Sequence, residues 1–172
     1  DYSTGAEAFL LEPQSTNLNT YSQNIPQNYV TTEMSDTFGY GIAPNGLQKS
    51  TRLQLSNVGS SRYVQTLTGI VLSGNTYTFS CYYKGTQGET AYMYALPVGG
   101  TTAVKAITFS GKWQREYLTF TAGSSSNYIY IVDTRQGGNA SDFEVWGAQL
   151  ENKLYATSYI KSEGSQTTRN QE

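Results

Sequence analysis

Apolar and polar residues alternate along several short stretches of the chain. The clearest stretch is 76–84 (TYTFSCYYK), where Tyr77, Phe79, Cys81 and Tyr83 share one phase. A period of two is typical of a β-strand with one face on a core, and no segment of useful length shows a helical period. Comparable stretches predict strands at 8–11, 51–56, 63–70, 76–84, 90–97, 104–109, 115–122, 128–134 and 143–151.

Clusters of Gly, Ser and Asn separate these predicted strands. They lie at 73–75, 85–88, 99–100, 110–111, 123–127 and 137–139. About eight to ten short strands at this spacing are typical of a β-sandwich, so we predict an all-β jelly roll of two antiparallel sheets. One module is expected over 1–162, in which the polar stretch 19–45 wraps the sandwich as loops with short strands. Residues 163–172 are polar and are predicted to form a tail or linker.

The composition agrees with strands joined by turns and narrows the range of partners. The 172 residues include 15 Tyr and 17 Gly, and 14% are charged. A net charge of −2 gives no basic field for a phosphate backbone, so nucleic acid is not an expected partner. No apolar run is long enough to span a membrane. The polar surface suits an extracellular or virion location, and the start at Asp1 without Met suggests a mature or excised part of a longer chain.

Histidine is absent from the sequence, and cysteine occurs once, as Cys81. Catalysis by Ser-His-Asp or Cys-His groups is therefore excluded, and a zinc site of the usual His/Cys type is nearly so. Cys81 shares the phase of Phe79, which predicts a small buried core residue. These absences do not exclude a Ca²⁺ site, because Ca²⁺ is bound by oxygen ligands.

Carboxylates are the remaining candidates for catalysis, since a glycosidase needs two of them. No motif distinguishes any pair, and thirteen acidic residues make chance proximity easy. We therefore expect no enzymatic activity. The carboxylates considered are Asp133, Asp142, Glu144 and Glu151.

Three pieces of the sequence carry a resemblance to a known class of module. They are 10–18 (LLEPQSTNL) with 21–23, 111–115 (GKWQR) leading into 118–122, and 146–151 (WGAQLE) followed by 156–160 (ATSYI), 164–165 and 168–169. Together they resemble the carbohydrate-binding-module-like jelly roll of bacteriophage fibre and spike proteins. Similar modules occur beside polysaccharide-degrading enzymes.

The resemblance implies recognition of a polysaccharide and a place in a larger chain, beside a catalytic domain or a fibre shaft. A homotrimer is one arrangement it allows. More distant relatives that bind xylan and β-glucan often hold a structural Ca²⁺ between an acidic residue near the first strand and Asp residues in the last. The matching places here read Gln23-Asn24 and Trp146-Gly147, which departs from that pattern.

Strand parity indicates which side chains point away from the core. In 143–151, Trp146 shares the phase of Leu150 and is predicted to be core, with Gln149 on the opposite face. The outward set combines flat aromatic rings with Arg, Lys and Gln, which suits the C–H patches and hydroxyls of sugars. The predicted ligand-binding residues are Tyr82, Lys84, Trp113, Arg115, Tyr117, Tyr128, Tyr130 and Gln149.

Each of these residues also has a purely structural interpretation. Tyrosines are common on any sheet surface. Trp113 could close one end of the core, and Arg115 could pair with Glu116 or Asp133. The sequence thus favours a non-catalytic module that binds a neutral or acidic polysaccharide, as a targeting or adhesion domain. The alternatives are a structural domain of a phage fibre or virion decoration protein, and an accessory domain of a lyase or hydrolase.

Overall fold

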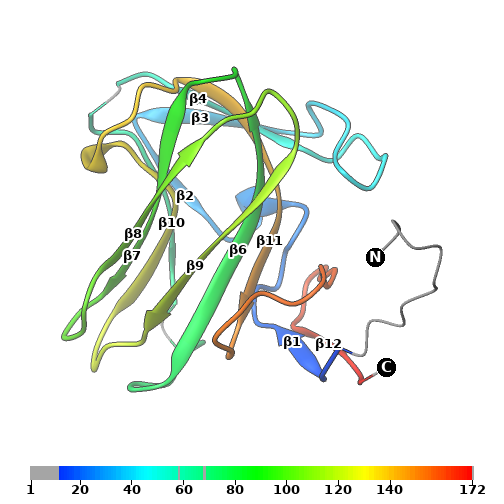
Figure 1. Ribbon diagram of the computed structural model, residues 1–172, viewed down its shortest axis with the longest axis vertical. Coiled ribbons are helices and arrows are strands. Elements are labelled where there is room, and N and C mark those ends of the chain that lie inside the picture. Colours follow the sequence, from blue (N-terminus) through cyan, green and yellow to red (C-terminus); the bar gives the residue numbers. More distant parts are fainter. Residues whose placement is uncertain (1–11, 58, 68, 172) are drawn as a thin grey trace, which may run out of the picture.

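Two five-stranded antiparallel sheets pack face to face and form a jelly-roll sandwich, which confirms the predicted all-β fold (Figure 1). The computed structural model describes residues 12–57, 59–67 and 69–171. A two-stranded ribbon lies at one end. No helix among these residues is long and apolar enough to cross a membrane, and the two that occur are the short 3-10 turns η1 (Ile25–Gln27) and η2 (Thr134–Gln136).

The first sheet, here called the tyrosine sheet, has the strand order β2-β5-β10-β7-β8. Its strands are β2 (Val30–Thr32), β5 (Arg62–Thr66), β10 (Asn127–Asp133), β7 (Thr90–Pro97) and β8 (Ala103–Thr108). The second, here called the strapped sheet, has the order β3-β4-β11-β6-β9. Its strands are β3 (Met34–Phe38), β4 (Thr51–Leu55), β11 (Asp142–Glu151), β6 (Thr76–Gly85) and β9 (Gln114–Thr121).

The alternating pattern located most of these strands correctly. Eight of the predicted ranges overlap β4 to β11, although the range 63–70 runs past the end of β5 at Thr66. β2 and β3 lie in the stretch expected to form loops with short strands. The predicted strand at 8–11 lies outside the described residues. The strands β1 (Ser15–Asn17) and β12 (Thr167–Arg169) were not predicted.

The core lies between the sheets and is built from the inward side chains of both. Phe109 and Phe143 pack with ring centroids 5.3 Å apart. A buried tyrosine needs a partner for its hydroxyl, and the Tyr83 hydroxyl donates to the Ile131 carbonyl oxygen at 2.9 Å. Cys81 is fully buried, as predicted, and burial raises the pKa of its thiol to about 12.

A β-bulge in β11 reverses the phase of that strand. Its pairing with β6 shifts between Trp146 and Gln149, at Gly147, which has a φ of 69°. Trp146 pairs with Tyr82 and faces outward, whereas Leu150 faces the core. The predicted shared phase of Trp146 and Leu150 is therefore wrong, because an inserted residue breaks the alternation that parity assumes.

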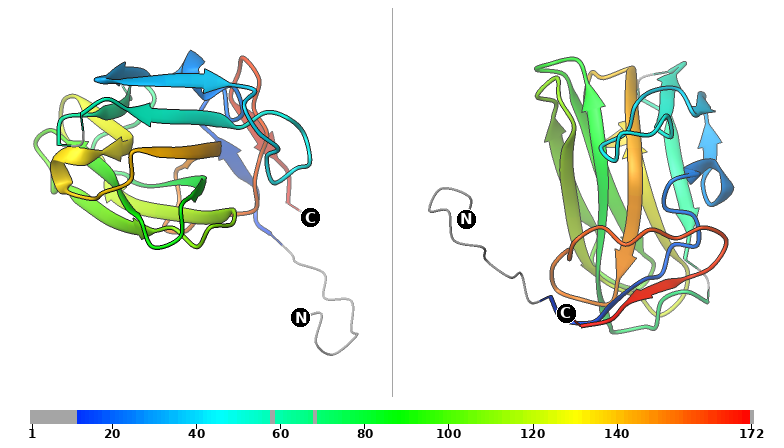
Figure 2. Two further views of the ribbon diagram at one scale, coloured as in Figure 1. Left: turned by 90° about the horizontal axis from the view of Figure 1, so that it is seen from above. Right: turned by 90° about the vertical axis from the view of Figure 1, so that its right-hand side faces the viewer.

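A segment here called the strap, residues 153–162, covers the outer face of β11 and β6 (Figure 2, right). Trp146 is buried there, 2% exposed, with its ring centroid 4.4 Å from that of Tyr159. The Tyr159 hydroxyl lies 2.6 Å from the hydroxyl of Ser22, and burial raises the pKa of Tyr159 to about 12. The outer face of this sheet is thus a second packed layer.

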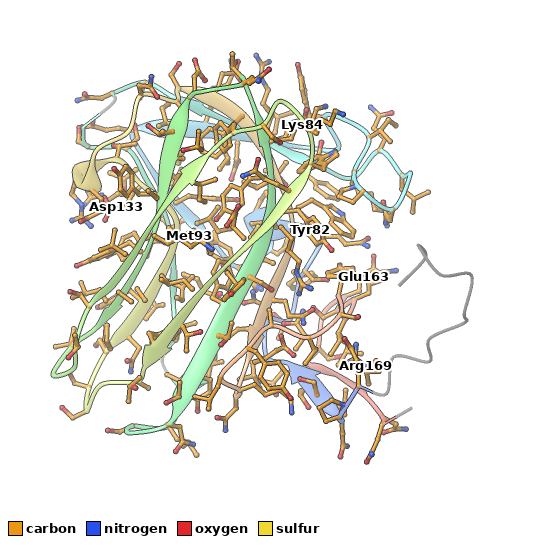
Figure 3. All side chains as sticks on the ribbon, in the orientation of Figure 1. Tyr82, Lys84, Met93, Asp133, Glu163 and Arg169 are labelled. Atoms are coloured by element: carbon orange, nitrogen blue, oxygen red, sulfur yellow. The ribbon has the colours of Figure 1, made fainter. Side chains whose placement is uncertain are left out.

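The segment predicted as a polar tail is partly structured. β12 pairs antiparallel with β1, and Arg169 forms an ion pair with Glu12 (Figure 3). A backbone bridge also joins Glu163 to Tyr21. Strand pairing and charge, not apolar burial, therefore hold these residues to the rest of the module.

Candidate functional site

The predicted binding residues lie on both sheets. Tyr128 and Tyr130 belong to β10 of the tyrosine sheet. The other six belong to the strapped sheet or its rim: Tyr82, Lys84, Trp113, Arg115, Tyr117 and Gln149. The outer faces of a sandwich point in opposite directions, so no single surface contains all eight.

Two of the predicted residues are used to hold the strap. Gln149 is fully buried, donating to the Ser158 carbonyl oxygen at 3.2 Å and accepting from the Ile160 N–H at 2.7 Å. Arg115 donates to the Thr157 carbonyl oxygen at 2.6 Å. Both side chains have protein partners, so we leave them out of the proposed ligand surface.

Arg115 also donates to the Ser80 hydroxyl at 2.9 Å, and its guanidinium lies 5.5 Å from the Tyr82 ring centroid. It pairs with neither acidic residue considered from the sequence, since Glu116 pairs with Lys105. Tyr82 is half-buried against Trp146, with ring centroids 5.3 Å apart. Arg115, Tyr82 and Trp146 thus form part of the layer beneath the strap.

The remaining predicted residues on this side, Tyr117, Trp113 and Lys84, lie near the rim of the strapped sheet. Tyr117 is 52% exposed, with the Lys105 ammonium 4.5 Å from its ring centroid. Trp113 precedes β9 and donates from its indole N–H to the Ile42 carbonyl oxygen at 3.0 Å. Lys84 lies beyond the strap on β6, 5.8 Å from the Trp113 ring centroid (Figure 3). Trp113 therefore holds a loop in place and does not close the core.

Aromatic side chains gather on the outer side of the tyrosine sheet. In β7, buried residues alternate with half-buried ones, and the half-buried set includes Tyr92 and Tyr94. Tyr130 pairs with Tyr94 across the strands, with ring centroids 5.3 Å apart and 54° between the ring planes. Tyr128 is the next outward residue of β10. Together these four tyrosines form what we call the tyrosine face.

Tyr92 and Tyr94 were not predicted as site residues. Parity along 90–97 could have found them, because Ala91, Met93 and Ala95 take the buried phase.

One end of the tyrosine face is bounded by η2. The Arg135 guanidinium lies 5.4 Å from the Tyr130 ring centroid and donates to the fully buried Asp133 at 2.8 and 2.5 Å (Figure 3). These hydrogen bonds raise the pKa of Arg135 above its usual value. Gly137 follows close to the Tyr92 ring, and a Cβ on it would lie 3.6 Å away. The edge therefore offers guanidinium donors while carrying little net charge.

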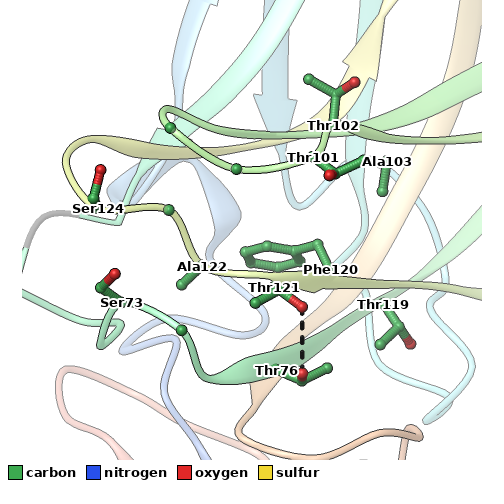
Figure 4. A pocket seen from close by; sticks show the side chains of 14 residues that line it. Ser73, Thr76, Thr101, Thr102, Ala103, Thr119, Phe120, Thr121, Ala122 and Ser124 are labelled. Atoms are coloured by element: carbon green, nitrogen blue, oxygen red, sulfur yellow. Dashed lines mark hydrogen bonds between the residues drawn. The ribbon is translucent and has the colours of Figure 1, made fainter.

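A hollow also lies away from these residues, at the end of the sandwich where β6 and β9 meet the turn after β7 (Figure 4). Its volume is 660 Å³, and Ser and Thr hydroxyls and glycines make up most of its lining. Phe120 is the aromatic residue in the lining and is 4% exposed. The hollow offers hydroxyls without an open ring, and none of the predicted residues lines it.

The residues do not fit the calcium site implied by the resemblance. Gln23 is buried and Trp146 is packed under the strap, so the matching places supply a neutral amide and an indole. These places thus lack the carboxylates that would balance the charge of a divalent cation buried there. No group of three or more His, Cys, Asp or Glu placed to hold a metal occurs in the part of the chain that the structure describes.

No protein-family model matches the sequence, and no curated protein matches it. Solved structures do match. The CBM22-1–GH10 portion of endo-1,4-β-D-xylanase 10B from Clostridium thermocellum, in complex with xylohexaose, has a TM-score of 0.60 at 15% identity over 86% of this chain. This chain spans 30% of the length of that one.

Two isolated modules match over nearly their whole length. The CBM22-1 xylan-binding domain of Paenibacillus barcinonensis Xyn10C has a TM-score of 0.56 at 15% identity, covering 82% of this chain and 94% of the domain. TmCBM61 in complex with β-1,4-galactotriose has a TM-score of 0.55 at 11% identity, covering 80% and 99%. At these identities the likeness shows the fold, which is that of carbohydrate-binding modules.

Proposed function

We propose that this chain is a non-catalytic module that binds a neutral polysaccharide along the tyrosine face. It would serve as a targeting or adhesion domain of a larger extracellular or virion-surface protein. The observation that carries the proposal is the gathering of tyrosine rings on the uncovered side of one sheet, where Tyr92, Tyr94 and Tyr128 are half-buried. The fourth ring, that of Tyr130, is buried at 7% exposure and supports Tyr94 from the side. The carbohydrate-binding modules that share the fold support it.

The spacing of the rings suits a chain of sugars better than a single one. Outward residues of one strand are about 6.6–6.8 Å apart, and neighbouring strands lie about 4.8 Å apart, so the half-buried rings of Tyr92, Tyr94 and Tyr128 cover several such steps. Sugar C–H patches can lie on these rings while their hydroxyls meet the tyrosine hydroxyls and Arg135. Because Arg135 is already paired with Asp133, the face favours a neutral ligand over an acidic one.

The carboxylates considered for catalysis are engaged in structural contacts, which supports the absence of activity in this proposal. Asp133 accepts from Arg135, and Glu151 accepts from Ser15 and Thr157 at 2.5 Å each. The other two, Asp142 and Glu144, form ion pairs with Arg52 and Lys84. All four carboxylates therefore have protein partners in the folded module.

Affinity electrophoresis on gels containing xylan, β-glucan, galactan or a uronan tests the proposal. We expect a neutral glycan to retard the protein. Tyr94→Ala and Tyr128→Ala should each weaken binding about tenfold, equivalent to about 1.4 kcal/mol. A single face binds weakly, so tandem or trimeric fusions should show higher avidity.

Tyr155→Ala is the matched control, because Tyr155 is 51% exposed and lies on the strap, away from the tyrosine face. Its retardation should equal that of the wild type. Absence of retardation on every glycan would contradict sugar binding and favour a structural domain of a fibre or virion. Equal loss in Tyr155→Ala and Tyr94→Ala would contradict the location.

A further inference from the structure

Another hollow lies at the rim of the strapped sheet, at the end of β6 that carries Lys84. Its volume is 310 Å³, close to the lower end of the range of about 300–1,000 Å³ for ligand sites. The loop 39–50 borders it, and Figure 3 shows Lys84 at this end of β6. We call it the paired-charge cleft, and the lining residues that matter are Tyr40, Arg52, Lys84, Thr86, Asp142 and Glu144.

Two ion pairs across neighbouring strands fix the polar groups of the cleft. Arg52 of β4 donates from Nε to Asp142 Oδ1 of β11 at 2.8 Å, and its Nη2 pairs with Oδ2. Lys84 of β6 donates to Glu144 Oε1 of β11 at 3.1 Å. The pairing leaves donors and acceptors open to solvent, because the Asp142 and Lys84 side chains are 46% and 40% exposed.

Aromatic rings stand beside these charges. Tyr40 is 46% exposed, and the Arg52 guanidinium lies 4.7 Å from its ring centroid. Trp113 lies next to Lys84 and is half-buried. The cleft thus combines exposed ring surface with planar, charge-assisted hydrogen-bonding groups.

The loop that carries Tyr40 is held rigidly against β11. The Ser50 hydroxyl donates to Glu144 Oε2 at 2.6 Å and accepts from the Gly41 N–H at 2.8 Å. Gly41 lies so close that a Cβ on it would be 2.3 Å from Glu144 Oε2. The indole hydrogen bond from Trp113 to Ile42 secures the far side of the loop. A site built this way binds without a large cost of ordering.

We propose that the paired-charge cleft binds one neutral pyranose unit, such as a monosaccharide or the end of a glycan chain. Two cations and two anions cancel, so a charged ligand gains no net attraction there. A neutral ligand rich in hydroxyls can donate to Asp142, accept from Arg52 or Lys84, and lay its C–H groups on a ring. This site does not depend on the tyrosine face, and it gives a role to the exposed ring of Tyr40 beside Arg52.

Amide chemical shifts of the whole chain, followed by NMR, test this inference with methyl glycosides of glucose, galactose, mannose and xylose, and with glucuronate. We expect at least one neutral glycoside to shift signals of residues 39–52 and 84–86 at millimolar concentration. Collisional quenching of tryptophan fluorescence should fall in parallel, because a bound sugar would shield Trp113. The other tryptophan, Trp146, is buried and contributes little to the quenching. Arg52→Ala and Tyr40→Ala should each weaken the response at least tenfold.

Asp142→Asn keeps the shape of the side chain and guards against a folding defect in Arg52→Ala; it should also weaken the response. Tyr94→Ala is the matched control and should leave the cleft response unchanged while it reduces polysaccharide retardation. Failure of the tyrosine face and failure of the cleft are therefore distinguishable. The inference is overturned if no glycoside shifts these signals, if glucuronate is preferred, or if Arg52→Ala and Tyr40→Ala respond like the wild type.

Discussion

The outer faces of the two sheets have similar chemistry but differ in exposure. Each carries aromatic rings and polar groups at alternating positions. On the tyrosine sheet the outward residues of β7 are half-buried, so the rings contact solvent. On the strapped sheet Trp146 is 2% exposed and Gln149 is fully buried. The difference is caused by the strap, which lies across one face only (Figure 2, right).

The strapped face shows what an outward polar residue does when it is covered. Gln149 and Glu151 find backbone and hydroxyl partners in the strap, as buried polar groups must. The tyrosine face has no such partners from the described chain beyond Arg135 beside Tyr130. A side chain that points outward is therefore available to a ligand only where no later segment covers it.

Removing one ring from each face should show the largest contrast. Trp146→Ala should lower the free energy of unfolding by about 3–5 kcal/mol, because a buried aromatic residue leaves a cavity. Tyr94→Ala should lower it by only about 1 kcal/mol, since its ring is partly solvated and loses mainly one aromatic contact. Urea denaturation followed by circular dichroism measures both. Equal losses would show that the tyrosine face is as tightly packed as the strapped face.

The sequence predicted the fold because its alternation and turn signals are local properties. It predicted the outward direction of Tyr128 and Tyr130 for the same reason. It misplaced Trp146 because a single inserted residue at Gly147 shifts the phase, and a glycine inside a strand is a weak signal of a bulge.

Parity correctly predicted that Gln149 points away from the core, but it could not predict that the side chain is buried. Its partners Ser158 and Ile160 come from the strap, whose path depends on tertiary packing. The paired-charge cleft is similar, since Arg52 and Asp142 are ninety residues apart and meet only through strand register. The proposed binding surface was thus only partly predictable, because the direction of a residue follows from the sequence and its exposure does not.

The bulge provides a smaller and more local test of the strapped face. Gly147→Ala should cost about 1–3 kcal/mol, because the positive φ is strained for alanine. In addition, the new Cβ would lie 3.0 Å from the Tyr82 ring and 3.3 Å from the Tyr159 ring. Thermal unfolding of the variant measures the loss.

Gly74→Ala separates backbone strain from crowding. Gly74 has a φ of 80°, but a Cβ there meets no atom within 4 Å, so this control should show the strain alone. If the two alanine variants lose equal stability, the strap does not press on the bulge, and the close packing of the strapped face is contradicted.

The smallest expected effect concerns the ion pair at the rim of the strapped sheet. The hydrogen bond from Arg52 holds the pKa of Asp142 below its ordinary value of 3.8. A carboxyl with a lowered folded-state pKa contributes stability above its unfolded-state pKa and loses it as the pH falls through the folded-state value. The wild type should therefore lose stability below about pH 4 more steeply than Asp142→Asn. The effect is small because solvent and salt screen an exposed pair.

Thermal unfolding midpoints of both proteins from pH 2 to 7 would show this difference as two converging curves. Raising the salt concentration should bring the curves together, because the contribution is Coulombic and exposed. Parallel curves at low salt would mean that Arg52 and Asp142 do not stabilise the folded state as a pair. The cleft would then lack the fixed polar groups that set it apart from the tyrosine face, whose proposed ligand contacts depend on rings that need no charge to hold them.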